Sequence, residues 1–120
     1  MGARGVVIGL SMGRAVVGCA LLAAPAKAAA WIGPEAALPA PQVMTRAMGG
    51  RDLALALGTL AAVRGDGVRV WLAACALADA ADFAATAVAG KALPPAGRAG
   101  TMALAAGATV AGLALLRELR

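Results

Sequence analysis

The chain has no histidine, tyrosine or asparagine, one phenylalanine, and two cysteines among its 120 residues. Without histidine there is no Ser–His or Cys–His pair for nucleophilic catalysis, and common ligands of zinc and haem are missing. Cys19 and Cys75 lie in separate apolar runs, so their spacing indicates neither a disulfide framework nor a zinc site. We therefore expect no metal and no cofactor, and we expect both thiols to be small buried hydrophobic groups.

Charge is also scarce, because charged residues make up 14% of the chain and hydrophobic residues 62%. Soluble domains contain about 45–50% apolar residues even when glycine is counted. A chain of this size could not cover so much apolar surface with polar groups, so the lipid bilayer is its expected partner. The net charge of +5 comes from basic residues scattered singly at segment ends. Because no aromatic platform accompanies them, anionic lipid headgroups are favoured over nucleic acid.

Four apolar windows are long enough to cross a bilayer, which takes about 20 helical residues. Three breaks separate them: "IGPEAALPAP" at 32–41, whose three prolines should leave the helical state, "RGDG" at 64–67, and "GKALPPAGR" at 90–98. The short turns make successive helices antiparallel. The sequence thus predicts an all-α, membrane-embedded antiparallel four-helix bundle, one domain over 1–120, with helices at about 5–24, 44–63, 70–89 and 99–116.

Arginine and lysine in the connections predict the orientation, since cytoplasmic loops are richer in both. Both termini share a side with the 64–67 turn. That side carries Arg4, Arg64, Arg69, Arg117 and Arg120, and the other carries Lys27, Lys91 and Arg98, with Arg46 arguable. This excess predicts that both termini lie in the cytoplasm. A cleavable signal ending at "APA", residues 24–26, is the alternative to an uncleaved first helix.

Small residues recur every fourth position and predict close helix contacts, because membrane helices associate through backbone proximity. We expect these contacts within the bundle, although the same faces could join two copies of the chain or a larger membrane complex. The positions are Gly5, Gly9 and Gly13; Ala76, Ala80 and Ala84; and Ala99, Ala103, Gly107 and Ala111.

Five charged side chains fall well inside the predicted spans, away from their ends, where an unpaired charge costs about 3 kcal/mol. At 100° per residue, Asp79 and Asp82 share one helix face with Cys75 and Thr86. Asp52 similarly shares a face with Thr45 and Thr59. Pairing would make the charges tolerable, so the sequence predicts an intramembrane polar cluster between the first three spans, formed by Arg14, Arg51, Asp52, Asp79 and Asp82.

Three functional hypotheses follow from this cluster. A latch that fixes helix register, in a protein with a structural or accessory role, is preferred. The cluster could instead line a polar cavity in a transporter or channel component for protons, ions or small solutes. The three acids exceed the two bases by one, and the surplus carboxyl could be protonated, face water or hold a ligand. A small intramembrane enzyme acting on an apolar lipid or terpenoid, with Asp79 or Asp82 as its acid, is the third hypothesis.

The run "MGGRDLALALGTLAAVRGDG", the following Trp-Leu helix ending in "DAADF", and the upstream "GRAVVGCALLAAP" resemble an uncharacterised family of small four-helix integral membrane proteins of high-GC bacteria. The resemblance covers nearly the whole chain and implies a topology but no chemistry. Small multidrug exporters carry a glutamate in their first helix where this chain has Arg14, and small fluoride channels need pore phenylalanines and asparagine. The positions that the resemblance singles out are Arg14, Pro25, Gly50, Arg51, Asp52, Gly58 and Asp82.

Overall fold

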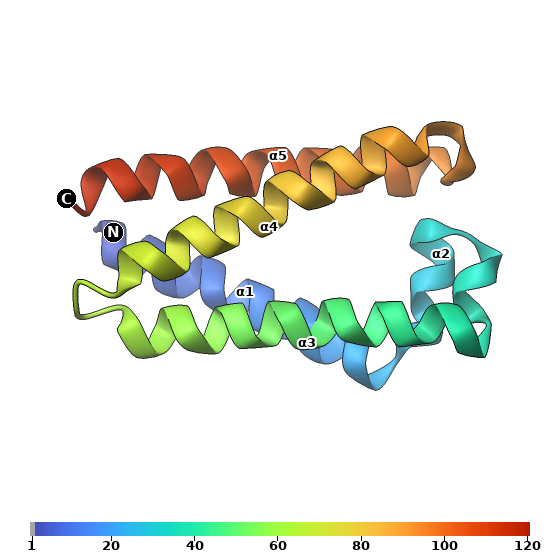
Figure 1. Cartoon of the computed structure of the whole chain (residues 1–120), viewed down its shortest axis with the longest axis horizontal. Helices are drawn as coiled ribbons and strands as arrows, with labels where there is room; N and C mark the ends of the chain where they lie inside the picture. The colour runs from blue at the N-terminus through green and yellow to red at the C-terminus, as the bar shows by residue number, and fades with distance from the viewer. Residues whose placement is uncertain (1) are drawn as a thin grey trace.

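The computed structural model describes residues 2–120, and within them it contains helices and turns but no strand. The prediction of an all-α protein is therefore confirmed. The long helices are α1 (Ala3–Ala23), α3 (Pro39–Ala62), α4 (Val68–Ala89) and α5 (Pro95–Glu118), and a single helical turn, α2 (Ala29–Ile32), precedes α3 (Figure 1). Three 3₁₀ turns, at Pro25–Ala28, Pro34–Ala37 and Gly90–Ala92, complete the connections.

Proline fixes where two of the long helices begin. α3 starts at Pro39 and α5 at Pro95, because proline lacks an N–H that the first helical turn would leave unbonded anyway. α3 consequently starts before the predicted window at 44–63 and includes Pro41 in its first turn. The expectation that 32–41 leaves the helical state holds for the α-helix only over 33–38, where a 3₁₀ turn lies between Gly33 and the extended Leu38, and it was wrong for 39–41. The φ of +117° at Gly33 suits glycine alone.

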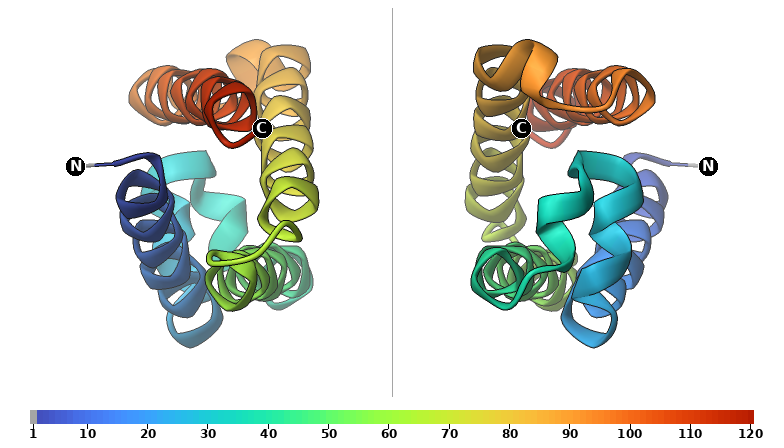
Figure 2. Two further views of the ribbon diagram at one scale, coloured as in Figure 1. Left: turned by 90° about the vertical axis from the view of Figure 1, so that its left-hand side faces the viewer. Right: turned by 90° about the vertical axis from the view of Figure 1, so that its right-hand side faces the viewer.

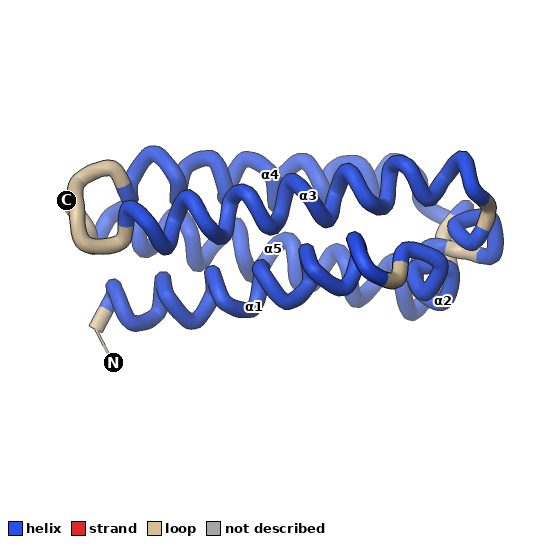
Figure 3. The backbone as a smooth tube through the Cα atoms, turned by 90° about the horizontal axis from the view of Figure 1, so that it is seen from below, coloured by secondary structure: helices blue, strands red, loops and turns tan. Residues whose placement is uncertain are grey.

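The long helices pack as two pairs. α1 lies along α3, and α4 lies along α5. We call these the α1/α3 pair and the α4/α5 pair. α4 leaves α3 after the turn at 63–67 and tilts toward α5, so the two pairs make fewer contacts with each other than within themselves (Figures 1 and 2). Both termini lie at the same end of the molecule as this turn (Figure 3). We call it the terminal end.

The α1/α3 pair meets backbone to backbone at two glycines. A Cβ placed on Gly18 would lie 2.7 Å from the carbonyl oxygen of Gly49, and a Cβ on Gly49 would lie 2.7 Å from that of Gly18. By contrast, Gly9 and Gly13 are exposed, and a Cβ on either would meet nothing within 4 Å among the described residues. The expectation that the Gly9 and Gly13 stripe forms the internal contact was therefore wrong, because α1 crosses α3 farther along.

The α4/α5 pair uses one of the small residues that we expected. Ala76 is buried against Gly112, where an added Cβ would lie 3.4 Å from that of Ala76. For most of the other predicted small residues on α4 and α5, the expectation of a helix contact was wrong. Ala80, Ala84, Ala99, Ala103 and Gly107 are exposed, and Ala111 is half-buried. In a chain so rich in alanine, a four-residue spacing does not identify the packed face.

Different contacts join the two pairs at their two ends. At the terminal end, an apolar cluster is formed by Val7, Val63, Val68, Leu72 and Leu115. At the opposite end, Trp31 of α2 donates its indole N–H to the hydroxyl of Thr101 at 2.5 Å. Its ring lies where a Cβ on Gly100 would approach within 2.7 Å. The segment between α1 and α3 thus reaches across to α5 and closes this end.

Three helices in residues 2–120 are long and apolar enough to cross a membrane: α1, α4 with its 3₁₀ extension to Ala92, and α5. α3 is long enough but falls outside this group, since Arg46, Arg51 and Asp52 reduce its hydropathy. Large apolar side chains face outward on all of these helices, and Val88, Leu77 and Val70 are 87%, 72% and 72% exposed. The protein therefore has the dimensions and the outer surface of a membrane-associated chain.

Candidate functional site

All five ionisable side chains of the predicted cluster lie together in the structure. Arg14 comes from α1, Arg51 and Asp52 from α3, and Asp79 and Asp82 from α4. Asp79 and Asp82 are three residues apart, so they project from one face of α4. Arg51 and Asp52 are adjacent and therefore diverge around α3, which lets Asp52 face α1 while Arg51 spans the gap to α4.

The charges alternate in sign along a chain of ion pairs. The guanidinium of Arg14 contacts Asp79 Oδ2 at 2.5 Å and Asp52 Oδ1 at 3.3 Å. Arg51 donates through Nη1 and Nη2 to the two oxygens of Asp82, each at 2.8 Å, and through Nη2 to Asp52 Oδ1 at 3.1 Å. The bidentate Arg51–Asp82 pair has the geometry of a strong charge-assisted hydrogen bond. The order along the chain is Asp82, Arg51, Asp52, Arg14, Asp79.

Burial differs from one end of this ion-pair chain to the other. The side chains of Asp52 and Asp79 are each 10% exposed and that of Arg14 is 16% exposed, whereas Asp82 is 25% and Arg51 33% exposed. Among the described residues, every buried side-chain nitrogen and oxygen has a hydrogen-bond partner. The deep end therefore leaves no fully buried side-chain nitrogen or oxygen without a partner, and the Arg51–Asp82 end lies toward the outside.

The two signs of charge are divided between the helix pairs. Both guanidiniums belong to the α1/α3 pair, with Asp52 between them, and the α4/α5 pair contributes Asp79 and Asp82. Three of the four ion pairs within residues 2–120 connect different helices, and two of these connect the α1/α3 pair to the α4/α5 pair. The cluster is thus the polar contact between two units that are otherwise joined mainly at their ends.

The threonines beside the cluster are buried but serve their own helices. Thr59 donates to the carbonyl of Leu55 and Thr86 to that of Asp82, each at 2.7 Å. Thr45 makes a longer bond of the same kind, 3.4 Å to Pro41. The polar stripes on α3 and α4 do face inward, as we expected, yet their hydroxyl protons are already donated to backbone carbonyls. Cys75 is half-buried near Thr59, whereas Cys19 is exposed, which contradicts the expectation that it is buried.

Two surface hollows lie away from the cluster, since neither is lined by Asp79 or Asp82. One, of about 670 Å³, lies at the terminal end. The other, of about 330 Å³, lies where Ala20 and Leu21 of α1 meet Lys27 and Trp31. No group of three or more acidic or cysteine side chains in residues 2–120 is placed to hold a metal ion.

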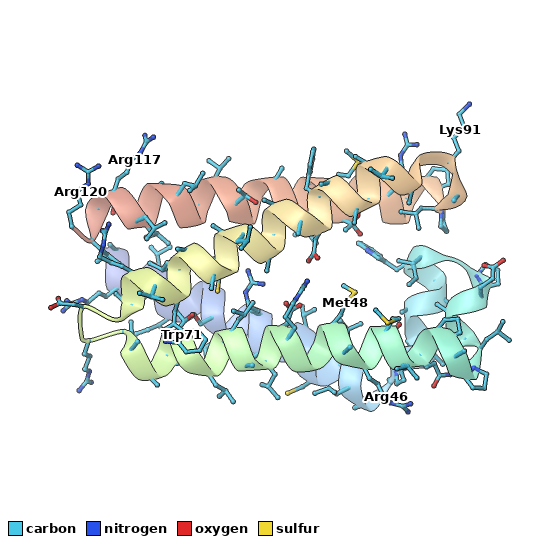
Figure 4. All side chains as sticks on the ribbon, viewed as in Figure 1. Arg46, Met48, Trp71, Lys91, Arg117 and Arg120 are labelled. Atoms are coloured by element: carbon cyan, nitrogen blue, oxygen red, sulfur yellow. The ribbon has the colours of Figure 1, made fainter. Side chains whose placement is uncertain are left out.

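Sequence reasoning missed several contacts that position the cluster. Trp71 packs on Gly58 so closely that a Cβ there would overlap its ring, which fixes α4 against α3 near the turn (Figure 4). Gly97 similarly leaves room for the backbone carbonyl of Trp31. Gly58 was singled out only by the family resemblance, and the sequence carried no signal for Gly97. Gly50, also singled out, would meet nothing within 4 Å in the described part of the chain.

Comparison with protein-family models, curated proteins and solved structures found no match. The class of protein therefore follows from its own fold and site. It is an all-helical chain with helices apolar enough to cross a membrane, containing a largely buried ion-pair chain between two helix pairs.

Proposed function

We propose that the chain is an integral membrane protein with a structural or accessory role, in which α1, α3, α4 and α5 cross the bilayer as an antiparallel four-helix bundle. α3 crosses despite its low hydropathy because its two mid-helix charges, Arg51 and Asp52, are paired with residues of α4 and α1. We place the protein in a bacterial cell membrane with both termini in the cytoplasm. The sequence resemblance to small four-helix membrane proteins of high-GC bacteria agrees with this proposal.

The observation that carries the proposal is the complete pairing of the cluster. Each guanidinium contacts two carboxylates, and each carboxylate contacts at least one guanidinium. Burying charges without partners in lipid is prohibitive, and pairing them makes the arrangement tolerable. The ion pairs then fix how the α4/α5 pair sits on the α1/α3 pair, so the cluster acts as a latch. With an opposite charge beside each member of the cluster, the helices present a mainly apolar outer surface to lipid or to a larger complex.

A transporter or channel component is the second candidate function, and the exposure of the cluster's outer end favours it. Arg51 and Asp82 are 33% and 25% exposed. Met48 shares the α3 face of Arg51 and points toward the α4/α5 pair, yet it is 42% exposed (Figure 4). A proton or ion could therefore reach Asp82 from this side, and separation of the two helix pairs would open the route.

Reconstitution into proteoliposomes distinguishes the two functions. The latch predicts that wild-type protein resists extraction from membranes at alkaline pH and carries no proton or ion flux, and that Asp82→Asn changes only stability. Flux through the wild type that disappears in Asp82→Asn would instead establish the transport function. Extraction of the wild type at alkaline pH would contradict membrane insertion itself.

A further inference from the structure

The hollow at the terminal end brings opposite charges together without pairing them. It is lined by Arg4 of α1, Asp66 of the turn, Glu118 of α5 and Arg120, and its volume is about 670 Å³. Within residues 2–120, none of these four side chains takes part in an ion pair of 4.0 Å or less. Two arginines and two acidic residues thus line one hollow, and their side chains are exposed.

Arg69 lines the same hollow but is already engaged. Its guanidinium donates to the carbonyl of Leu116 at 2.6 Å and to that of Leu119 at 3.3 Å. These carbonyls belong to the last turn of α5, where helical partners are lacking. Arg69 therefore fixes the end of α5 beside α4, which places Glu118 and Arg120 at the rim of the hollow. The remaining lining, Gly2, Ala3 and Leu119, is apolar.

From this arrangement we propose that the terminal hollow binds the headgroup of a zwitterionic phospholipid that carries a primary ammonium, as in phosphatidylethanolamine. The phosphate accepts hydrogen bonds from the guanidiniums of Arg4 and Arg120, and the ammonium donates to the carboxylates of Asp66 and Glu118. The volume falls in the range of small-molecule sites, about 300–1,000 Å³. A lipid, rather than a free solute, is the occupant because helices of the proposed bundle end here, at the level of the headgroups.

The inference rests on the proposed membrane insertion, but it is tested separately. The full chain in detergent is titrated with phosphatidylethanolamine, phosphatidylcholine and phosphatidylglycerol, and bound lipid is counted by native mass spectrometry. We expect phosphatidylethanolamine to bind at least about tenfold more tightly than either of the others. The methylated ammonium of phosphatidylcholine cannot donate hydrogen bonds, and phosphatidylglycerol has no cation. Equal affinity for the three lipids would overturn the proposal.

Matched variants test the assigned contacts. Arg120→Gln and Arg4→Gln should each weaken phosphatidylethanolamine binding about tenfold, while Glu118→Gln should remove its preference over phosphatidylglycerol. Arg117→Gln is the control, since Arg117 lies at the same end but does not line the hollow (Figure 4). If Arg117→Gln weakened binding as much as Arg120→Gln, general attraction between charges would explain the lipid binding, and the proposed site would be contradicted. Circular dichroism checks that each variant keeps its helices.

Soluble O-phosphoethanolamine distinguishes the lipid from a free headgroup. We expect it to bind at least about tenfold more weakly, because it lacks the acyl chains that would lie on the apolar helix surface. If O-phosphoethanolamine and phosphatidylethanolamine bound with equal affinity, the occupant would be a free phosphoethanolamine compound, and the proposal of a lipid would be wrong. A protein that inserts into membranes but shows no headgroup preference would refute this inference alone. A protein that alkaline buffer extracts from membranes would refute the proposed function.

Discussion

Asp52 is the residue on which the ion-pair chain depends most. Its Oδ1 accepts from Nη1 of Arg14 at 3.3 Å and from Nη2 and Nε of Arg51 at 3.1 and 3.3 Å, so one carboxylate oxygen serves both guanidiniums. Asp79 and Asp82 each serve a single arginine. Asp52 therefore reduces the electrostatic repulsion between the guanidiniums of Arg14 and Arg51.

Reversing one ion pair tests whether the latch works through charge. Arg51→Asp should lower the free energy of unfolding by about 3 kcal/mol, because it leaves Asp82 unpaired among carboxylates. The partial exposure of both side chains makes this an upper value. Arg51→Asp combined with Asp82→Arg restores opposite charges at the same sites and should regain at least half of the loss. Unfolding in SDS, followed by tryptophan fluorescence, measures both.

Arg46→Asp is the matched control for this reversal. Arg46 lies on the same helix, is exposed, and points away from the α4/α5 pair (Figure 4). The change in charge is the same, so a loss equal to that of Arg51→Asp would show that net charge, rather than pairing, sets stability. A double variant no more stable than Arg51→Asp alone would likewise contradict the latch.

At the scale of the elements, glycine determines how α1 and α3 cross. Side chains at Gly18 and Gly49 would collide with the opposing backbone, so the two helices approach as closely as backbones can. This approach brings Arg14, one turn before Gly18, within reach of Asp52, which lies one turn beyond Gly49 on α3. The close crossing of α1 and α3 therefore determines the position of Arg14 and Asp52 at the buried end of the ion-pair chain.

Alanine at the crossing should separate the helices. Gly18→Ala is expected to lower the free energy of unfolding by about 1–3 kcal/mol, since a Cβ there would lie 2.7–2.8 Å from backbone atoms of α3. Gly13→Ala, on the open face of the same helix, should be neutral or stabilising by up to about 1 kcal/mol through helix propensity. Unfolding in SDS compares the two. Similar losses for both variants would mean that α1 does not cross α3 at Gly18.

The sequence predicted the cluster better than it predicted the helix contacts. Charges in an apolar chain must find partners, so the two arginines and three aspartates could be grouped without knowing the packing, but the individual pairs could not. The packed glycines could not be chosen from Gly9, Gly13 and Gly18, because each is small and only the crossing point distinguishes them. The contact of Trp31 with Gly97 was also beyond prediction, since it joins segments whose register depends on the whole fold.

At the scale of the whole molecule, both termini and the 63–67 turn lie at one end, and the 24–38 and 90–94 connections lie at the other (Figures 1 and 3). Figure 4 places Arg117 and Arg120 at the terminal end and Lys91 at the opposite end. In the proposed orientation the terminal end faces the cytoplasm, following the excess of arginine there.

Single cysteines test this orientation in a background of Cys19→Ser and Cys75→Ser. Glu35→Cys should react with a membrane-impermeant maleimide in intact cells, whereas Arg64→Cys should react only after the cells are opened. The opposite pattern would reverse the orientation. Equal reaction of both in intact cells would contradict a bundle that spans the bilayer.

The order of the charges along the chain has a consequence for biogenesis. Arg14 is synthesised 38 residues before Asp52 and 65 residues before Asp79, and Arg51 is made 31 residues before Asp82. In the proposed topology, each cation leaves the ribosome ahead of an anion that will neutralise it. α1 alone would enter lipid with an uncompensated guanidinium, at a cost of about 3 kcal/mol. In that topology, α1 would gain its first counter-charge only when Asp52 of α3 is made, and the pairing of both arginines would be complete only with α4.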